Sequence, residues 1–141
     1  MNDWVMLILP KVFTRIKTQF SENVKTKYGM TDVNFTTVGS NDTPAVFPFV
    51  YVQLLPALET GRDLEGTSIN GGTFTFQIDV IDNKSQSNTR EVMSEVVRIM
   101  KTMGFEVNSM PNYVTTQDKT HRMTARFRRS IDKNDFIKWR Y

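Results

Sequence analysis

Hydrophobic and polar residues alternate strictly from Thr73 to Val80, at the start of a segment that reads TFTFQIDVID. The apolar residues occupy every second position: Phe74, Phe76, Ile78 and Val80. Because successive side chains of a strand point to opposite faces, this pattern predicts a strand with one buried face. Such a strand needs a second layer to cover its apolar side.

The hydrophobic period changes after the polar turn that follows this strand. The next apolar residues fall three and four positions apart: Val92, Met93, Val96, Ile99, Met100 and Met103. This spacing predicts a helix with one apolar stripe, and therefore a sheet covered by a helix. We expect Asn88 to cap the first turn, with Glu91 bonding back to it. We expect Gly104 to end the helix in a left-handed conformation, followed by apolar Phe105.

A helical pattern also precedes this unit, from Asp3 to Tyr28. Its apolar side consists of six residues: Leu9, Val12, Phe13, Ile16, Phe20 and Val24. We expect Pro10 to start or kink the main helix, because its ring is strained inside a helix. Gly29 is expected to close the segment. Val33 to Val38 is predicted to be a short strand, with Val33 and Phe35 on one face.

A further strand is predicted from Phe47 to Leu55, apolar on both faces, with Pro48 at its beginning or on an edge. One face is expected to meet the helices and the other a different surface. Residues 57–72, rich in glycine and charge, then lead to the Thr73 strand. Because strands close in sequence usually pair antiparallel, we predict a long hairpin loop between the two central strands. Loops of this length are often functional, and the alternative is a disordered connector.

The last strand is predicted from His121 to Ile131, after two short strands at Phe105 to Ser109 and Tyr113 to Thr115, separated at Pro111. Its apolar face carries Met123, Ala125, Phe127 and Ile131, joined by Arg129, and its other face carries Arg122, Thr124, Arg126, Arg128 and Ser130. The order helix, strands, helix, strands predicts an α+β fold. We expect an antiparallel β-sheet with helices packed on one face.

A chain of 141 residues is long enough for one domain with a real core. We divide it into an N-terminal helix at about 3–28, a core of sheet and helix at about 33–131, and a C-terminal tail at 132–141. The tail is apolar and aromatic, with Phe136, Ile137, Trp139 and Tyr141. We expect it to dock on its own subunit or on a neighbour.

Composition excludes several classes of protein. The apolar fraction of 39% is ordinary for a globular chain, and no apolar run approaches the roughly 18 to 20 residues needed to cross a bilayer. The initial WVMLILP stretch lacks a basic region before it and a cleavage site after it, so we expect no signal peptide. The absence of cysteine excludes disulfides, thiol chemistry and cysteine-based zinc sites, and the single His121 cannot build a histidine-rich metal site.

The net charge of +3 is distributed unevenly along the chain. From Arg98 onward there are ten Lys and Arg against four acids, whereas the preceding 97 residues hold eight against eleven. This gives +6 and −3 for the two parts. Such polarity suits contact with an oppositely charged surface, either a nucleic acid or another copy of the chain.

The sequence contains no motif that indicates an enzyme. It holds no phosphate-binding glycine motif and no serine in a nucleophile elbow, and His121 shows no orienting partner. Asp79 and Asp82 lie three positions apart on a strand and point to opposite faces, so we interpret them as solvated acids rather than a catalytic pair. We expect no cofactor and no metal.

A row of three arginines on the last strand is the most distinctive group of candidate functional residues. Arg122, Arg126 and Arg128 share one face of the last strand, about 6.6 to 13 Å apart. That strand face carries no aromatic residues, on which binders of single-stranded nucleic acid stack bases. Charge patterning leaves three interpretations open with equal weight: a solvated face, a protein interface, or contact with a nucleic-acid backbone.

The order of these segments resembles the tail terminator proteins of long-tailed bacteriophages, also called tail-completion or minor tail proteins. The segments that carry the resemblance are Phe47-Pro-Phe-Val-Tyr-Val-Gln, a glycine-rich hairpin tip, Phe74-Thr-Phe-Gln-Ile-Asp-Val, a helix ending Met103-Gly104-Phe105, and Arg122-Met-Thr-Ala-Arg-Phe-Arg-Arg-Ser-Ile-Asp. They span about residues 45 to 132. Other phage neck or head–tail joining proteins, and a nucleic-acid-binding domain that uses the basic strand, are the alternatives.

The resemblance implies a structural protein of the virion tail or neck, assembled in the host cytoplasm. Such proteins form a hexameric ring that caps the tail tube, ends its polymerisation and joins it to the head–tail connector protein. The expected partners are further copies of the chain, the tail tube protein and the connector, with DNA passing through the lumen without specific binding, and no membrane.

The resemblance also assigns roles to particular residues. The expected subunit interface comprises Arg122, Arg126, Arg128, Phe136 and Trp139. The hairpin loop is expected at a subunit junction or the lumen, with Glu59, Arg62, Asp63 and Glu65 as its charged residues. Acids that face the lumen would repel the phosphates of passing DNA.

Overall fold

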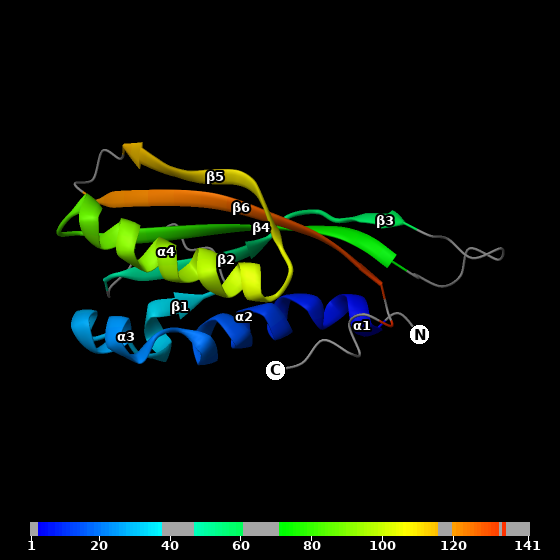
Figure 1. Ribbon diagram of the computed structural model, residues 1–141, viewed down its shortest axis with the longest axis horizontal. Coiled ribbons are helices and arrows are strands. Elements are labelled where there is room, and N and C mark those ends of the chain that lie inside the picture. Colours follow the sequence, from blue (N-terminus) through cyan, green and yellow to red (C-terminus); the bar gives the residue numbers. More distant parts are fainter. Residues whose placement is uncertain (1–2, 38–46, 61–70, 116–119, 133, 135–141) are drawn as a thin grey trace.

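Helices cover one face of a six-stranded sheet in the computed structural model, which describes residues 3–37, 47–60, 71–115, 120–132 and 134 (Figure 1). The helices are α1 (Asp3–Met6), α2 (Ile8–Gln19), α3 (Glu22–Tyr28) and α4 (Gln86–Thr102). The strands are β1 (Phe35–Thr36), β2 (Phe49–Leu54), β3 (Leu58–Thr60), β4 (Gly71–Asp82), β5 (Glu106–Thr115) and β6 (His121–Asp132). The predicted α+β fold is confirmed.

The sheet has the strand order β1-β2-β4-β6-β5, and β3 also pairs with β4. Strand β6 pairs with one edge of β4 over the whole length of β4. Strands β2 and β3 pair with the other edge of β4, one after the other. The prediction of an antiparallel sheet holds for every described pairing except β1 with β2, which is parallel. A parallel pair needs a connection of about a dozen residues. Residues 37–48 provide a connection of this length.

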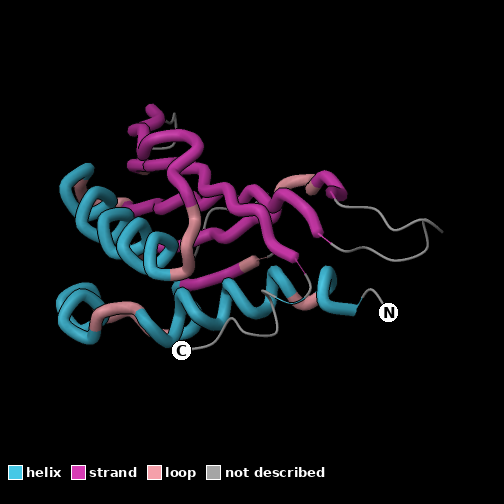
Figure 2. Tube along the Cα trace, turned by 45° about the vertical axis from the view of Figure 1, so that its right-hand side comes forward, coloured by secondary structure: helices cyan, strands magenta, loops and turns pink. Residues whose placement is uncertain are grey.

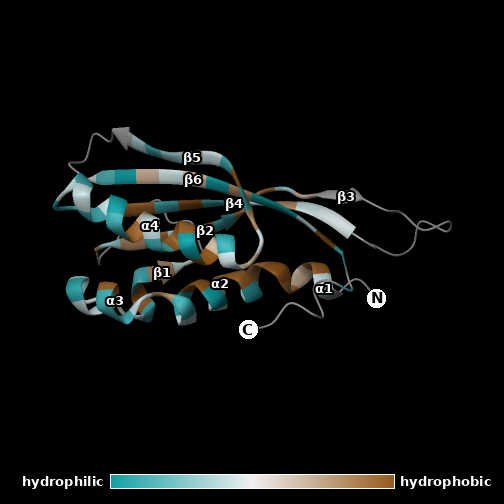
Figure 3. Ribbon diagram, viewed as in Figure 1, coloured by the Kyte–Doolittle hydropathy of each residue, from teal (hydrophilic) through white to brown (hydrophobic). Residues whose placement is uncertain are grey.

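One face of the sheet forms the core together with the helices, as Figure 2 shows by their position on one side of the strands. The alternating apolar residues of β4 and β6 are buried there as predicted, and α4 buries Val92, Met93, Val96, Ile99 and Met100 against them. Phe76 meets Phe105 edge to face, with ring centroids 5.5 Å apart. Figure 3 shows the same division along α2 and α4, whose apolar stripes face the sheet.

The start of α4 differs from the prediction. Ser85, not Asn88, is the N-cap, and its hydroxyl accepts a hydrogen bond from the Asn88 backbone N–H at 3.2 Å. Asp82 adds a second cap, because its Oδ2 accepts from the Lys84 and Ser85 backbone N–H groups and from the Asn88 side-chain amide, each at 3.0 Å. Several polar residues in a row each offered a possible cap, and sequence alone could not rank them.

The end of α4 agrees with the prediction. Gly104 has a φ of +83°, and the Phe105 N–H donates to the Met100 carbonyl at 3.1 Å, which completes the left-handed ending that glycine permits. A methyl group on Gly104 would lie 3.1 Å from the Arg129 Nε. Gly104 is therefore constrained by its backbone and by a neighbouring side chain.

The predicted N-terminal helix is broken into three. Pro10 lies in the first turn of α2, where its missing N–H costs nothing, and α1 ends at Met6, four residues before it. A second break follows at Phe20, whose extended backbone turns its ring into the core against Phe35, 5.3 Å away between centroids. The tertiary contact of Phe20 thus overrides the helical period. Gly29 ends α3 with a φ of +64°, as expected.

Two predictions about the shorter strands need correction. Val33 belongs to a 3-10 turn (Asp32–Asn34) and is exposed, so the first strand is only Phe35–Thr36. Pro111 does not divide the chain into two strands, because β5 continues through two irregularities in its register. An edge strand tolerates proline in this way.

The loop of the hairpin is shorter than predicted. Residues 58–60 and 71–72 were expected to belong to the loop, but they form β3 and the start of β4, which pair with each other. Backbone ladders need no particular side chains, so the glycines and charges concealed this pairing. Figure 1 shows these strand ends extending beyond the helices.

The left-handed glycines generate the first prediction. Gly104→Ala should lower the free energy of unfolding by more than the roughly 1–2 kcal/mol that a left-handed alanine costs, because its methyl group also crowds Arg129. Gly29→Ala is the matched control, since its φ is also positive and nothing lies within 4 Å of an added methyl group. Urea denaturation measures both, and an equal loss in the two variants would contradict the contact with Arg129.

A polar cluster joins α3 to α4. The Glu91 carboxylate accepts hydrogen bonds from the Lys27 ammonium at 2.8 Å and from the Tyr28 hydroxyl. The hydrogen bond from Lys27, together with that from Tyr28, holds the pKa of Glu91 below its usual value of 4.5. The hydrogen bond and the charge of Glu91 raise the pKa of Lys27 above 10.5. The folded state therefore favours the charged pair.

The sign of these shifts generates the second prediction. The stabilisation by ionised Glu91 is complete above pH 4.5 and is lost as the pH falls through its lowered pKa. Glu91→Gln should therefore lower the melting temperature at about pH 7, by a small amount typical of exposed pairs. The difference from wild type should shrink as the pH falls below 4.5. A difference independent of pH would show that the glutamate charge has no role.

Candidate functional site

The second face of the sheet carries no helix among the described residues. We call it the open sheet face; it consists of the side chains of β2, β4, β5 and β6 that point away from the helices. The strand register places Gln53, Gln77 and Arg126 in one row across it, and Tyr51, Asp79 and Thr124 in the next. Thr75, Arg128 and Glu106 form a third row. The face is therefore polar and basic at β6.

The three predicted arginines lie together on this face but differ in their contacts. Arg126 donates from Nε to the Gln77 side-chain oxygen at 3.0 Å. Arg128 lies 3.9 Å from the Glu106 carboxylate, and both side chains are at least half exposed, so the pair is weak. The Arg122 Nε is buried and has no hydrogen-bond partner among the described residues. Arg126 and Arg128 are therefore the two that a partner can reach.

Aromatic residues share the open sheet face with these arginines. The register places Phe49 level with Ile81 and Arg122, and Tyr51 level with Asp79 and Thr124. Both rings are partly exposed. The sequence-based expectation of an arginine row without aromatics is correct for β6 alone but wrong for the sheet. The apolar residues on the second face of the Phe47 strand were the signal that could have shown it.

Asp79, Asp82 and His121 have partners in the structure, contrary to expectation. Asp79 and Asp82 point to opposite faces, but both are buried, at 5% and 2% exposure. Asp79 accepts a hydrogen bond from the Thr124 hydroxyl at 2.7 Å, and Asp82 caps α4. His121 lies 3.0 Å from the Tyr113 hydroxyl, so it does have an orienting partner. These partners give each group a structural role.

A polar hollow lies beside the Arg128 end of the row. The described pairing of β5 with β6 begins at Glu106 and Arg128. A hollow of about 480 Å³ lies there, lined by Thr73, Gly104, Glu106, Arg128, Arg129 and Ser130. Its polar lining does not suit an apolar ligand.

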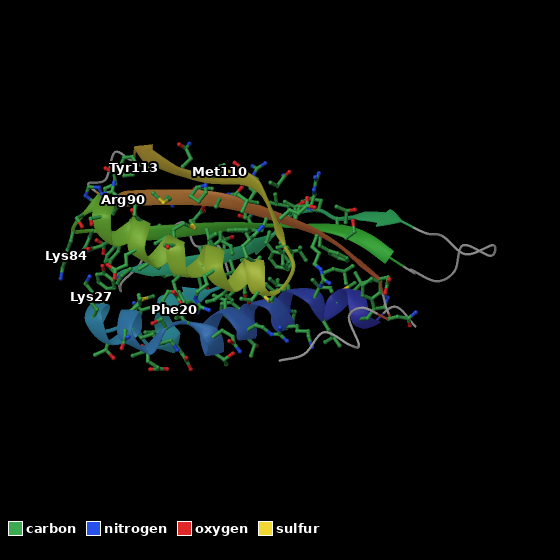
Figure 4. The ribbon with its side chains drawn as sticks, viewed as in Figure 1. Phe20, Lys27, Lys84, Arg90, Met110 and Tyr113 are labelled. Atoms are coloured by element: carbon green, nitrogen blue, oxygen red, sulfur yellow. The ribbon has the colours of Figure 1, made fainter. Side chains whose placement is uncertain are left out.

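An apolar groove lies on the helix side, between α4 and β5. We call it the methionine groove; its lining is Arg90, Met93, Ser94, Val97, Val107, Met110, Pro111 and Met123, around a volume of about 430 Å³. Met110 is 73% exposed. Figure 4 shows Arg90 on α4 and Met110 on β5, which contribute to the two sides of the groove. The sequence did not predict this groove, because Met110 lies at the register irregularity of β5.

The remaining predicted site residues cannot be compared with the structure. Arg62, Asp63 and Glu65 of the hairpin, and Phe136 and Trp139 of the tail, lie outside the described residues. Glu59 lies in β3, where its backbone is level with Gly72, and its side chain also lies outside the description. Their roles stay predictions.

The described ranges contain neither a cluster of metal ligands nor a helix of membrane-spanning character. Within residues 3–37, 47–60, 71–115 and 120–132, no three or more acidic or histidine side chains are grouped as metal ligands. Over the same part of the chain, no helix is long and apolar enough to cross a membrane. Compared with known proteins, the sequence matches no protein-family model and no curated protein.

Proposed function

We propose that this protein is the repeating subunit of a homo-oligomeric ring that caps a bacteriophage tail tube, ends its polymerisation and joins it to the head connector. The observation that carries the proposal is the open sheet face, on which Arg126 and Arg128 lie exposed on β6. The assignment to a phage tail rests on the order of sequence segments from Phe47 to Asp132.

Self-association in a ring requires two different patches on one subunit that complement each other. The basic patch is at β6, on the open sheet face. Exposed acids on the helix layer, at Glu22 of α3 and Asp32 of the 3-10 turn, offer it a partner on a neighbouring copy. Because these two patches differ, a contact between them is head-to-tail rather than two-fold.

The hairpin supports a role beyond the subunit contact. Strands β3 and β4, which flank the connection 61–70, extend beyond the helices (Figure 1). In a ring, this element reaches a neighbouring subunit or the lumen. Asp63 and Glu65 in that connection would repel DNA phosphates during DNA passage.

A second candidate function is favoured by Phe49 and Tyr51. Partly exposed aromatic rings and arginines on one sheet face are the elements with which sheet domains bind single-stranded nucleic acid. Asp79 is buried between the two sets and accepts a hydrogen bond from Thr124, which makes the centre of the face less favourable to phosphate. We therefore place self-association first.

Charge reversal of the basic patch generates the third prediction. Arg126→Glu/Arg128→Glu should convert the oligomer to monomer in size-exclusion chromatography with light scattering, because both residues would repel an acidic partner. A hexamer is six times 16.3 kDa, about 98 kDa. The matched control is Lys84→Glu/Lys101→Glu, which makes the same charge change at exposed positions on the helix side and should leave the oligomer intact.

Three outcomes would contradict the proposal for the ring. These are a wild-type chain that stays monomeric at all concentrations, a reversed variant that still forms the oligomer, and an oligomer without a central opening in electron micrographs. If the reversed variant instead loses affinity for single-stranded DNA, with a steep salt dependence in the wild type, the second candidate function replaces the first.

Replacement of the hairpin connection generates the fourth prediction. An Asn-Gly turn in place of residues 61–70 should leave the melting temperature nearly unchanged, because Thr60 and Gly71 are already level in the ladder and this turn suits a two-residue hairpin. We expect the variant to lose ring closure in light scattering. A large fall in melting temperature would show that the connection supports the core instead.

A further inference from the structure

The methionine groove is an apolar surface that the core leaves partly uncovered. Met93 and Met123 form its floor at 1% and 7% exposure, whereas Met110 on its rim is 73% exposed. Methionine side chains adapt to irregular partners and make favourable contacts with aromatic rings. Arg90 at the rim adds a cation that can stack on an aromatic face. The groove is therefore suited to aromatic side chains.

The chain itself contains an aromatic segment of matching chemistry. Four of the nine residues from 133 to 141 are apolar or aromatic: Phe136, Ile137, Trp139 and Tyr141. Asp135 precedes them and is the one acid of a segment that also carries Lys133, Lys138 and Arg140. A segment with aromatic residues at this density has a composition typical of protein interfaces.

The geometry of β6 limits which copy of the tail can fill the groove. Met110 lies between the rows of Thr124 and Arg126, and Asp132 is about seven residues, or 23 Å, further along β6. The backbone of Phe136 reaches at most about 14 Å from Asp132, even when fully extended. Trp139 reaches about 25 Å, without any residues left to reverse the direction of the chain. Val107, the end of the groove nearest the tail, is level with Phe127, about five residues or 16 Å from Asp132. A subunit's own tail therefore reaches its groove only as an extended segment turned back along β6, whereas the tail of a neighbouring copy has no such restriction.

We propose that the methionine groove binds the C-terminal aromatic segment, residues 133–141, of a neighbouring copy of this chain. Phe136 and Trp139 of one subunit lie between α4 and β5 of the next, against Met110 and Arg90. The contact is heterologous, because tail and groove are different surfaces, and it therefore suits a closed ring. The inference rests on the proposed homo-oligomer and identifies one of its contacts.

Cysteine cross-linking tests the contact in the full chain, which contains no cysteine of its own. A Met110→Cys protein is mixed with a Lys138→Cys protein that carries a size tag, and the mixture is oxidised. This fifth prediction expects a disulfide-linked heterodimer at twice 16.3 kDa, about 33 kDa plus the tag, on a non-reducing gel. Ser94→Cys, a second exposed groove position, should cross-link in the same way.

The matched control is Glu22→Cys, an exposed position on α3 and outside the groove. Its yield with Lys138→Cys should be several-fold lower than that of the groove cysteines. An equal yield would overturn the proposal. So would cross-linking confined to one chain in a Met110→Cys/Lys138→Cys double variant, since the tail would then occupy its own groove.

The cross-link and the solution mass separate the two proposals. A wild-type ring without the heterodimer overturns the tail contact and leaves the proposed function standing. A heterodimer formed by a chain that assembles only into open or two-subunit species supports the tail contact and overturns the ring.

Discussion

Burial of one face of β4 and β6 beneath α4 is the constraint on which the rest of the structure depends. Phe76 and Phe127 are fully buried there, and Phe76 meets Phe105 just after the helix ends. Loss of a buried phenylalanine side chain typically costs about 3–5 kcal/mol, a large part of the stability of a domain. Gly104 makes this packing possible. Its left-handed backbone turns the chain from the end of α4 toward the sheet, so that the next residue, Phe105, enters the core.

The sequence predicted those parts of the fold that depend on a repeated pattern. The period of two in β4 and β6 and the stripe of α4 were each identified with the correct buried face. Features decided by single contacts were not. Phe20 leaves its helix for a place beside Phe35, and Ser85 caps α4 although Asn88 is equally suited by type. Strand β3 was concealed because backbone pairing needs no distinctive side chains.

The candidate site was predictable strand by strand but not across strands. The row of Arg122, Arg126 and Arg128 follows from the period of β6 alone. Its combination with Phe49 and Tyr51 depends on the register of β2 against β4, which no local pattern specifies. The methionine groove depends on the irregular pairing of β5, and sequence patterns do not indicate where a strand loses its register.

The irregular edge strand β5 bears on how far copies of this protein can associate. A long, regular outer strand would accept another strand, and then another, without limit. Pro111 removes one hydrogen-bond donor from β5, and its two register shifts interrupt the regular spacing of the others. Continuous sheet extension is therefore blocked at this edge. A molecule built in this way is protected against growing into a fibre through this edge.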